Sequence, residues 1–469
     1  MQRPGGRRGL RTADVMTAVR ARVASRALGP GDRLPSIRGL ARTMGVSPST
    51  VVEAYDRLVA EGLIRARPGS GFYVSAAALP PLALAQDRPQ QDRAVDPFWV
   101  SRQSLDADPA AAKPGCGWLP PDWMPAGALR RALRAAARAG DEVLCDYGAA
   151  RGSLALRRIL IGRFAAEGIG MSADRLLLTA SGTQAIDLVC RFLLRPGDAV
   201  VVDDPCYFNF RALLRAHQVK VVGVPYTPCG PDVGAFEAVL AAERPRLYVT
   251  NSALHNPTGA TLSAQTAHRL LNLAAAHGLT VVEDDIFADF EPEPSVRMAA
   301  LDGLDRVIRI GSFSKTLSAS VRCGYIAARP DWIDSLADLK IATSFGGGRL
   351  AAELLLAALT DGGYRKHMET VRGRLAAAME RTVGRLDGLG IAPWLVPQAG
   401  MFLWCRLPGG VDAAAVARAC LRDDVVLAPG NAFSRSQTAS SFLRFNVAQS
   451  LDDRIFAVLE RALRSAAPA

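Results

Sequence analysis

The sequence predicts two folded parts: a small N-terminal domain of three helices and a β-hairpin, and a large α/β domain built on a mostly parallel sheet. The first 75 residues hold 13 arginines, no lysine and 5 acidic residues, so most of the net charge of +11 lies in the first sixth of the chain. A stretch rich in Ala, Pro, Gln and Asp follows, and beyond it short apolar runs alternate with amphipathic stretches. The length of 469 residues is that of roughly two to four domains.

The bulk composition is that of a globular protein that does not cross a membrane. Apolar residues make up 49% of the chain and charged residues 22%, and no uncharged apolar run reaches about 18 residues. The basic N-terminus leads into an amphipathic pattern without the apolar core of a signal peptide, so we expect a cytoplasmic protein. The eight cysteines are scattered, with no Cys-x-x-Cys pair and no His at metal-ligand spacing. This favours reduced thiols and no metal site.

The basic N-terminal domain begins with helical patterns. Apolar residues at helical spacing predict a helix from Thr12 to about Ala27. A second short helix follows Pro35-Ser36, and Gly45 supplies a tight turn to a third helix from Pro48 to Glu61, with Ser47 as its N-cap. The residues expected on the buried face of the third helix are Val51, Ala54, Tyr55 and Leu58.

The residues after the third helix complete a recognisable fold. Leu63–Arg67 and Gly71–Val74 are predicted to be two strands joined by Pro68-Gly69-Ser70, so that three helices and a hairpin form a winged helix-turn-helix across residues 1–75. The motifs that accompany it closely resemble the GntR-type DNA-binding domain. They are Gly31-Asp32-Arg33-Leu34-Pro35-Ser36, Val46-Ser47-x-x-Thr50-Val51 with Ala54-Tyr55, Glu61-Gly62-Leu63-Ile64, and Gly69-Ser70-Gly71.

That resemblance implies double-stranded DNA as a partner. The third helix would enter the major groove while the wing touches the adjacent backbone or minor groove. Carried over by position, the residues that face DNA would be Arg38, Ser47, Ser49, Thr50, Gly69 and Ser70. Many relatives have a basic residue where this chain has Pro48, so we expect one DNA contact of the family to be missing. The competing interpretation, arginines on a merely solvated helix face, leaves the turn and the wing unexplained.

Residues 76–114 are predicted to be an interdomain linker, because they are rich in Ala, Pro and Gln and lack sustained periodicity. In residues 115–469, short apolar runs alternate with amphipathic helices, a pattern typical of a mostly parallel α/β sheet. The predicted strands are Leu176–Thr179, Ala199–Asp203, Lys220–Val224, Arg246–Thr250, Leu279–Glu283, Val307–Ile310 and Gly324–Ala328. A smaller α+β unit, about residues 384–469, is expected to close the chain.

Ligands of such sheets collect at the carboxyl ends of strands, and five turns with suitable chemistry fall there. Small residues that open a helix leave N–H groups free for a phosphate, an aromatic side chain can stack on a ring, and a buried carboxylate needs a partner charge such as a protonated pyridine nitrogen. The turns are Ser181–Gln184, Asp204–Tyr207, His255–Gly259, Glu283–Asp285 and Gly311–Arg322. Each alone has a simpler explanation, such as an N-cap or a packing tyrosine, but five in this order favour one site.

Lys315 is the residue around which these turns are organised. It is one of five lysines, against 51 arginines, and it follows the apolar run Val307–Ile310 inside a hydroxyl-rich turn. A primary amine at a strand end, with Ser312 and Ser314 beside it and Arg322 seven residues later, suits a Schiff base to an aldehyde cofactor that carries a phosphate. The alternative is a solvated surface lysine, and the other four turns argue against it.

The order of the five turns closely resembles that of the fold-type I aminotransferases that use pyridoxal 5′-phosphate (PLP), over about residues 115–460. The resemblance implies that Lys315 forms the internal aldimine with PLP, that Asp284 binds the pyridinium nitrogen and that Asn256 bonds the ring hydroxyl. It also implies that Tyr207 stacks on the cofactor ring. The phosphate cradle would consist of Thr183, Gln184, Ser312, Ser314 and Arg322.

Two further residues and one departure complete the resemblance. Tyr147 looks like the tyrosine that reaches a neighbouring subunit's phosphate, and Arg444 looks like the arginine that binds a substrate carboxylate, a task suited to its bidentate fork. Relatives usually carry a tyrosine three residues after the pyridinium-binding aspartate, where this chain has Phe287. The missing hydroxyl weakens the case for efficient transamination and leaves the case for cofactor binding intact.

A GntR-type winged helix joined to an aminotransferase-like domain resembles the MocR family of transcriptional regulators. The resemblance implies a homodimeric regulator whose large domain senses an amino acid or related amine through Lys315, with Arg444 selecting a carboxylate. Two alternatives stay open: a working aminotransferase whose DNA-binding head has a minor role, and a regulator that has lost the cofactor. The intact set of Lys315, Asp284, Asn256 and Arg322 argues against a lost cofactor.

Overall fold

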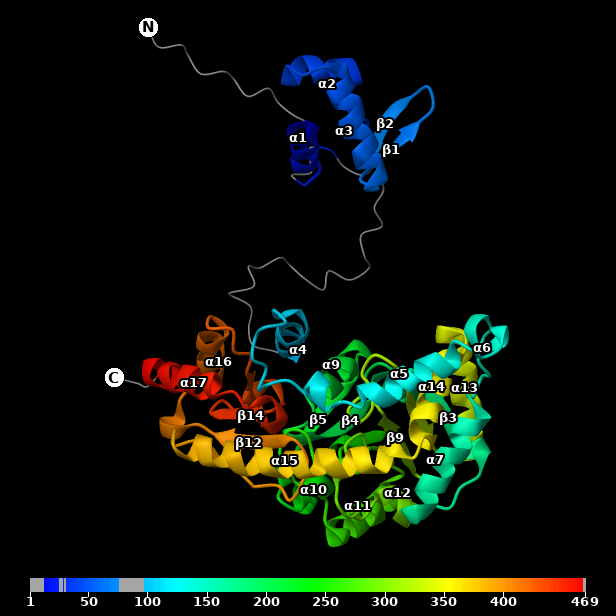
Figure 1. Cartoon of the computed structure of the whole chain (residues 1–469), viewed down its shortest axis with the longest axis vertical. Coiled ribbons are helices and arrows are strands. Elements are labelled where there is room, and N and C mark those ends of the chain that lie inside the picture. Colours follow the sequence, from blue (N-terminus) through cyan, green and yellow to red (C-terminus); the bar gives the residue numbers. More distant parts are fainter. Residues whose placement is uncertain (1–11, 25–27, 29–30, 76–96, 467–469) are drawn as a thin grey trace. The chain divides into compact units, whose positions relative to one another are not determined.

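The computed structural model describes residues 12–24, 28, 31–75 and 97–466 (Figure 1). Contacts divide the chain into two compact units, residues 1–93 and residues 94–469, and each is described by itself. The N-terminal residues 1–11, the predicted end of the first helix at Ala27, and residues 76–96 of the predicted linker lie outside the described residues.

The first unit is the predicted winged helix-turn-helix. Its elements are α1 (Thr12–Ala24), α2 (Ile37–Met44), α3 (Pro48–Ala60), β1 (Ile64–Arg67) and β2 (Gly71–Val74). Ser36 and Ser47 cap α2 and α3 by accepting from the N–H groups of Gly39 and Thr50, as an N-cap serine does. Gly45 ends α2 with a φ of 64°, a left-handed conformation that favours glycine in the tight turn.

The hydrophobic core of this unit confirms the predicted helix faces. Val51, Ala54, Tyr55 and Leu58 of α3 are fully buried, and they pack against apolar residues of α1, α2 and the hairpin. Tyr55 is buried, and its hydroxyl donates to the carbonyl oxygen of Pro35 at 2.9 Å, so the polar end of this core residue is satisfied.

The second unit is built on an eight-stranded sheet in the order β3-β10-β9-β8-β7-β4-β5-β6. The strands from β9 across to β5 run parallel, and β10 is antiparallel to both its neighbours. The mostly parallel sheet predicted from the sequence is therefore confirmed. The strands are β3 (Leu176–Thr179), β4 (Ala199–Asp204), β5 (Lys220–Thr227), β6 (Gly230–Pro231), β7 (Leu247–Thr250), β8 (Thr280–Asp284), β9 (Val307–Ser312) and β10 (Gly324–Ala327).

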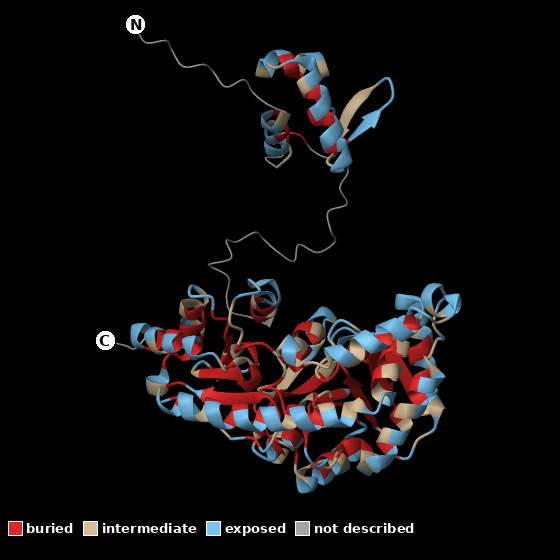
Figure 2. Ribbon diagram, in the orientation of Figure 1, coloured by how far each residue is buried: buried red, intermediate tan, exposed pale blue. Residues whose placement is uncertain are grey.

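Helices cover both faces of this sheet, and Figure 2 shows most of its strands buried, whereas β5 is largely half-buried or exposed. Successive strand residues point to opposite faces, so Val200 and Val202 pack in one core cluster and Val201 in another. The helices of this unit that precede or alternate with the strands are α5 (Ala126–Ala136), α6 (Asp141–Cys145), α7 (Leu154–Ala166), α8 (Gly182–Leu193), α9 (Phe208–Ala216), α10 (Val233–Glu243), α11 (Ala264–His277), α12 (Met298–Asp302), α13 (Pro330–Ser344) and α14 (Arg349–Thr360).

A long helix, α15 (Gly363–Asp387), leads into a smaller C-terminal part, whose α+β character was predicted. Its four-stranded sheet has the order β11-β12-β14-β13. The elements are β11 (Ala392–Pro393), β12 (Phe402–Arg406), α16 (Ala413–Leu421), β13 (Ala428–Pro429), β14 (Phe442–Asn446) and α17 (Asp453–Ala466). Because β14 pairs with both β12 and β13, its side chains are fixed from two sides.

Part of the range predicted as a linker is folded. Helix α4 (Pro97–Asp106) buries Trp99 and Val100 in the core cluster of the C-terminal part. Ala112 forms a bridge with Val425 and donates its N–H to the carbonyl oxygen of Asp424. The Ala112 contacts join segments more than 300 residues apart, and the local composition of the segment, rich in Pro and Asp, gives no sign of them.

No helix within the described residues is both long and apolar enough to cross a membrane. In the same residues, no group of three or more His, Cys, Asp or Glu side chains has the arrangement of a metal site, and all eight cysteines are free thiols.

Candidate functional site

The carboxyl ends of the parallel strands β4, β7, β8 and β9 bring the predicted site residues to one edge of the sheet. Tyr207 follows β4, Asn256 follows β7, Asp284 ends β8 and Lys315 follows β9. Arg444 donates to Asn256 Oδ1, and the charges of Asp284 and Arg444 act on the pKa values of both Lys315 and Tyr207, so these side chains lie close together. Four of the five predicted turns are thus brought to one edge of the sheet, because neighbouring parallel strands all end there. The fifth, Ser181–Gln184, follows β3, which runs in the same direction as β9 because each is antiparallel to β10.

The three acids at the end of β8 are sorted by the alternation of the strand. Glu283 and Asp285 face the side of the sheet that carries α7 and α12, whereas Asp284 faces the site. Asp284 accepts a hydrogen bond from the Ile286 N–H at 3.2 Å, and no ion pair to it is found among the described residues. Burial raises its pKa to about 7, and the neighbouring Asp285 charge acts in the same direction.

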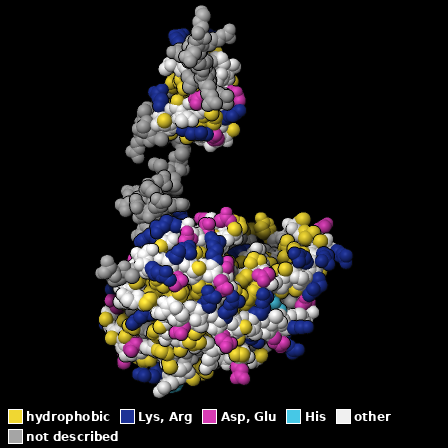
Figure 3. All heavy atoms as spheres, turned by 60° about the vertical axis from the view of Figure 1, so that its left-hand side comes forward, with side chains coloured by type: hydrophobic (Ala, Val, Ile, Leu, Met, Phe, Trp, Pro, Cys, Tyr) yellow, Lys and Arg dark blue, Asp and Glu magenta, His cyan; other side chains and the backbone are white. Residues whose placement is uncertain are grey.

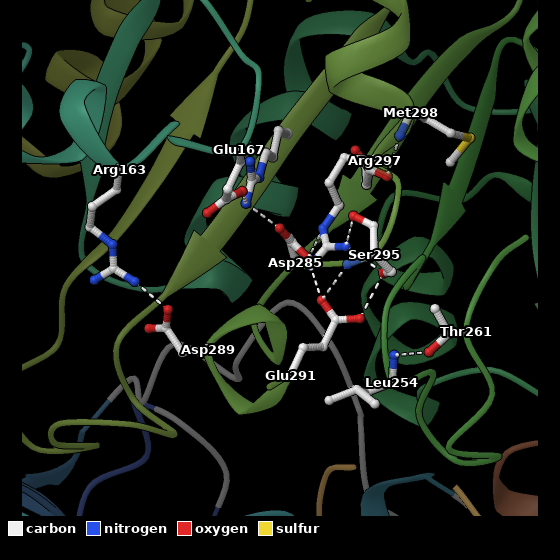
Figure 4. A network of polar contacts seen from close by, with 12 residues as sticks. Arg163, Glu167, Leu254, Thr261, Asp285, Asp289, Glu291, Ser295, Arg297 and Met298 are labelled. Carbon is white, nitrogen blue, oxygen red and sulfur yellow. Dashed lines mark hydrogen bonds and ion pairs between the residues drawn. The ribbon is translucent and has the colours of Figure 1, made fainter. Parts of the chain in front are cut away.

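Asp285 is held by arginines in a buried polar network (Figure 4). The Nε of Arg297 donates to one carboxylate oxygen at 2.8 Å, and Arg309 forms an ion pair with the other. Arg297 also pairs with Glu291 at 2.5 Å, and Arg309 with Glu167 at 2.5 Å. The two arginines compensate the negative charge of Asp285. Because Asp285 is next to Asp284, this compensation reduces the repulsion that would raise the Asp284 pKa further.

Lys315 lies in a partly buried position on the turn after β9. Burial lowers the pKa of its amine to about 8; the charges of Arg444 and Arg322 act in the same direction, and those of Cys116 and Asp284 oppose it. No carboxylate of the described residues forms an ion pair with it. A larger fraction of this amine is therefore unprotonated at neutral pH than for a lysine in water, which is what a nucleophilic lysine requires.

Arg444 extends from β14 and is only 1% exposed. Its guanidinium donates to Asn256 Oδ1 at 2.8 Å and to the carbonyl oxygen of Gly115 at 2.6 Å, while its Nε has no partner within the described residues. The rings of Phe402 and Phe433 lie 4.4 and 4.8 Å from its central carbon. It forms no ion pair with any described carboxylate, and burial lowers its pKa to about 10.

The predicted phosphate cradle is brought together in part. Ser312 Oγ lies 2.9 Å from Ser314 Oγ and accepts from the Ser314 N–H at 3.1 Å. The Gly182 end of α8 adjoins Ser312, because a Cβ built on Gly182 would lie 3.8 Å from the Ser312 Cβ. Arg322, with a φ of 54°, lines a cavity of about 330 Å³ beside Thr179 and Ala180.

The two predicted cradle residues on α8 differ from each other. Thr183 is exposed in the first turn of the helix, and its hydroxyl has no hydrogen-bond partner in the described part of the chain. Gln184 already has partners: its N–H donates to Ser181 Oγ at 3.0 Å, its Oε1 accepts from the Ala180 N–H at 2.7 Å, and its amide nitrogen donates to Ser344 Oγ. Gln184 therefore braces the turn, and one N–H of its amide nitrogen is left over once Ser344 is bound.

The two predicted tyrosines have different surroundings. Tyr207 is partly buried, its ring lies 4.9 Å from Phe208 and 5.4 Å from Phe210, and burial raises the pKa of its hydroxyl. Tyr147 is 72% exposed and packs edge-on against Phe345, which is itself 64% exposed. Within this chain Tyr147 does not enter the site, although the next residue, Gly148, lines the cavity that contains Arg322.

Phe287, which stands where aminotransferases usually have a tyrosine, is buried with an exposed fraction of 4%. Its ring packs edge-on against Phe402 at 5.3 Å, and Phe402 in turn lies against the Arg444 guanidinium. The Phe287 ring therefore has an apolar neighbour in Phe402. Because Phe402 also contacts the Arg444 guanidinium, Phe287 packs behind the ring on which Arg444 lies.

One part of the site, the segment from Gly115 to Trp118, was not predicted from the sequence. A Cβ built on Gly117 would lie 3.8 Å from both Lys315 Nζ and Arg444 Nη2, so the segment borders the space between these two cations. Asn446 holds it by donating to the carbonyl oxygens of Cys116 at 3.1 Å and Trp118 at 2.8 Å. Asn251, which donates to the Asp284 carbonyl oxygen at 3.0 Å, also escaped prediction.

In the first unit, the predicted DNA-facing residues lie on exposed parts of the winged helix. Arg38, Ser47 and Ser49 are exposed, and Thr50 is half-buried. Ser47 Oγ lies 2.8 Å from both Ser49 Oγ and Thr50 Oγ1, so three hydroxyls cluster at the N-terminus of α3. Gly69 and Ser70 occupy the hairpin turn, where Gly69 has a φ of 71°. The structure thus presents the helix start and the wing tip to solvent.

Two family models match the chain, and they cover the two units in turn. Residues 11–74 match the bacterial regulatory proteins of the gntR family, and residues 121–461 match the class I and II aminotransferases. Among solved structures, α-aminoadipate aminotransferase LysN from Thermus thermophilus is 28% identical, with a TM-score of 0.70 over 78% of this chain and 94% of that one. A kynurenine aminotransferase from Pyrococcus horikoshii, 24% identical with a TM-score of 0.72 over 80% of this chain and 96% of that one, has the same fold.

Relatives that span both units are regulators by name. An uncharacterized HTH-type transcriptional regulator of Escherichia coli, YdcR, is 30% identical over 93% of this chain and 94% of its own length. The HTH-type transcriptional regulator NorG of Staphylococcus aureus is 25% identical over 81% of this chain and 87% of its own length. A GntR-type winged helix is followed by a class I and II aminotransferase domain, and a transcriptional regulator matches both over 94% of its length, so the chain belongs to the MocR family of transcriptional regulators.

Proposed function

We propose that this protein is a DNA-binding transcriptional regulator whose large unit holds PLP at Lys315 and senses an amino acid or related amine there. The observation that carries the proposal is the convergence of two buried charges, Asp284 and Arg444, with the Lys315 amine at one edge of the sheet. No described residue forms an ion pair with any of the three. Buried charges without partners are costly, so a ligand that supplies the partners is the simplest explanation.

The residues of the site fit PLP. When bound, PLP supplies an aldehyde that condenses reversibly with primary amines, and a ring and phosphate that the protein can hold. The Asp284 carboxylate would accept from the protonated ring nitrogen, Asn256 would bond the ring hydroxyl, and Tyr207 would stack on the ring. Thr183, Ser312, Ser314, Arg322 and the free N–H groups that open α8 would bind the phosphate.

The pKa values of Asp284 and Lys315 agree with this assignment. A carboxylate whose pKa is raised to about 7 by burial gains most from a positive partner, because such a partner restores its ionised form. An amine whose pKa is lowered to about 8 is in part a free nucleophile at neutral pH. Asp284 would therefore fix the charge of the ring nitrogen, and Lys315 would supply the reactive amine.

Arg444 is the residue that we assign to the effector. Its guanidinium is oriented by Asn256 and the Gly115 carbonyl, and its Nε remains without a partner in the described part of the chain. A carboxylate would complete its hydrogen bonds and neutralise its charge, since the planar fork binds carboxylates in two-point geometry. We therefore propose an effector that carries both an amine, for Lys315, and a carboxylate, for Arg444.

We further propose that the protein is a homodimer. Exposed apolar side chains gather on α5, α6 and the region from α13 to α14, and elements α5 and α6 both contact α14. The exposed apolar side chains are Leu133, Leu144, Tyr147, Phe345 and Leu350. A second copy covering this face would bring its Tyr147 toward a neighbouring cofactor site, and a twofold dimer would present two DNA-binding heads for paired half-sites.

The proposal is tested by a gel shift at fixed salt on the DNA that flanks the gene. We expect PLP-loaded and PLP-stripped protein to bind this DNA specifically, and an amino acid effector, found by screening the standard amino acids, to change the binding of the loaded form alone. An absence of specific binding in both forms would remove the regulator proposal. If the PLP-stripped protein still responded to the effector, the protein would sense the effector without PLP.

The DNA assignment of the head gives a second expected result. Arg38→Ala should weaken binding to specific and unrelated DNA alike and lower the slope of log affinity against log salt by about 1, because one phosphate contact is lost. Arg20→Ala is the matched control, since Arg20 pairs with Glu61 at 2.6 Å and lies outside the predicted DNA face. Equal salt slopes for Arg38→Ala and the unchanged protein would remove Arg38 from the interface.

A working aminotransferase is the second candidate function, and the 28% identity to LysN is the observation that favours it. It predicts repeated turnover of an amino acid with an oxoacid acceptor. The regulator proposal predicts binding with little turnover, in keeping with Phe287 at the position of the usual tyrosine.

A further inference from the structure

A cavity of about 600 Å³ in the large unit lies outside the PLP site and has a basic lining. It is formed where α4 packs on α9, beside the start of β5 and the loop that precedes β14. Its cations are Arg211 and Arg215 of α9, Lys220 of β5 and Arg435 of the loop. The volume falls within the range of about 300 to 1,000 Å³ that is typical of small-molecule sites.

What distinguishes this group of cations is the scarcity of acids to balance them. Figure 3 shows Lys and Arg side chains spread among acidic and apolar ones over the large unit, so positive charge alone marks no site there. Lys220 pairs with Glu243 at 2.5 Å. Among the described residues, none of Arg211, Arg215 and Arg435 forms an ion pair, and Asp204, the nearby acid, accepts instead from the backbone N–H groups of Arg435 and Ser436 at 3.0 and 2.8 Å.

Arg211 is fixed in place by the loop it faces. Its Nη1 donates to the carbonyl oxygens of Asn431 at 3.4 Å, Ala432 at 3.0 Å and Ser434 at 2.7 Å. Burial lowers its pKa, Cys206 and Asp204 oppose this shift, and the positive charges of Arg435 and Arg215 add to it. Three guanidinium groups are thus close enough to repel one another, and Nε and Nη2 of Arg211 have no hydrogen-bond partner among the described residues.

Apart from Gln218, the rest of the lining is apolar. Phe98 of α4, which is 42% exposed, and Val219 and Val221 at the start of β5 form this part of the wall. We propose that the cavity is a binding site for a small organic molecule with two or more negatively charged oxygens, a phosphate ester or a polycarboxylate. Such a ligand would pair with Arg211, Arg215 and Arg435 and place its carbon skeleton against Phe98.

Occupancy of this site has a structural consequence for the effector site. Arg211 joins helix α9, which follows Tyr207, to the loop at residues 431–434, and Phe433 of that loop lies 4.8 Å from the Arg444 guanidinium. An anion that bridges Arg211 and Arg435 would stabilise the attachment of this loop to α9. The site would therefore act on Arg444 without contact with Lys315.

The test is calorimetric titration of the full-length, PLP-loaded protein with inorganic pyrophosphate and, separately, with citrate, at constant ionic strength set with NaCl. PLP loading keeps the phosphate cradle of the first site filled. We expect binding of at least one probe, and a loss of affinity of about tenfold or more in the double variant Arg215→Gln/Arg435→Gln, because two charge-assisted hydrogen bonds are removed. Arg211 is left intact because it holds the loop.

A control variant and a second measurement make the outcomes decisive. Arg269→Gln/Arg365→Gln removes the same charge from two exposed arginines on α11 and α15 and should leave the affinity unchanged. Binding of the preferred probe distinguishes phosphate from carboxylate chemistry. The proposal is overturned if neither probe binds, if both double variants lose affinity equally, or if Arg215→Gln/Arg435→Gln binds the probes normally but weakens the gel shift, which would assign the surface to the DNA backbone.

Discussion

Lys315→Ala is expected to abolish covalent retention of PLP and, with it, the response of DNA binding to the effector. The reason is that the reactive amine is removed from a site whose other groups stay in place. The measurement is borohydride reduction of the PLP-loaded protein followed by mass spectrometry, which should find the cofactor mass on the peptide that contains residue 315 and find none in the variant. In the gel shift, the variant should behave like PLP-stripped protein with and without the effector.

Two controls separate this result from a general loss of structure. Lys366→Ala removes an exposed lysine from α15 and should change neither the adduct nor the effector response. The far-UV circular dichroism of Lys315→Ala should match that of the unchanged protein. A Lys315→Ala protein that still responds to the effector would contradict the assignment of sensing to this amine. A full PLP adduct on another lysine would mean that PLP binds covalently to that lysine instead.

Arg444→Ala is expected to weaken binding of a carboxylate-bearing effector by about 2 to 5 kcal/mol, or roughly 30-fold or more, because a buried carboxylate would lose its charged partner. Arg444→Lys should recover part of this loss, since an ammonium keeps the charge and lacks the planar fork. The measurement is titration of the PLP-loaded protein with the effector, followed by the change in absorbance of the cofactor.

The matched probe is the amine obtained by removing the carboxylate from the same effector. It should bind the unchanged protein weakly and bind Arg444→Ala about equally, because it has no group for Arg444 to hold. The substitution also leaves Asn256 Oδ1 and the Gly115 carbonyl oxygen without their donor. Any resulting damage to the site should weaken the binding of both probes, so the difference between the probes measures recognition of the carboxylate. Equal losses for both probes would mean that Arg444 supports the site and does not recognise the carboxylate.

The sequence by itself determined the fold of both units and the order of the turns that form the site. The N-cap at Ser47, the left-handed turn at Gly45 and the alternation that separates Asp284 from Glu283 and Asp285 are local features, because they depend on backbone conformation within a few residues. Once the strands pair in parallel, their carboxyl ends lie at the same edge of the sheet whatever the side chains are. Lys315, Asp284, Asn256 and Tyr207 could therefore be predicted to lie at one edge of the sheet.

The roles of single side chains within a turn were less predictable. Thr183 and Gln184 are neighbours in the same helix-opening turn, but the Gln184 amide has partners at Ala180 and Ser344 and Thr183 remains exposed. Which of two adjacent polar side chains stays free for a ligand depends on the elements that pack beside the turn. Here that element is the end of α13, which lies 160 residues further along the chain.

Only the tertiary structure decided which distant segments complete the site. The Gly115–Trp118 segment borders Lys315 because Arg444, 329 residues away, donates to Gly115, and α4 is folded because the C-terminal core accepts Trp99. The arginine-lined cavity likewise joins α4, α9 and the loop before β14. The spacing of residues within a segment carries no information on the register in which separate elements pack, since that register is set by side-chain shapes and charges from both partners at once.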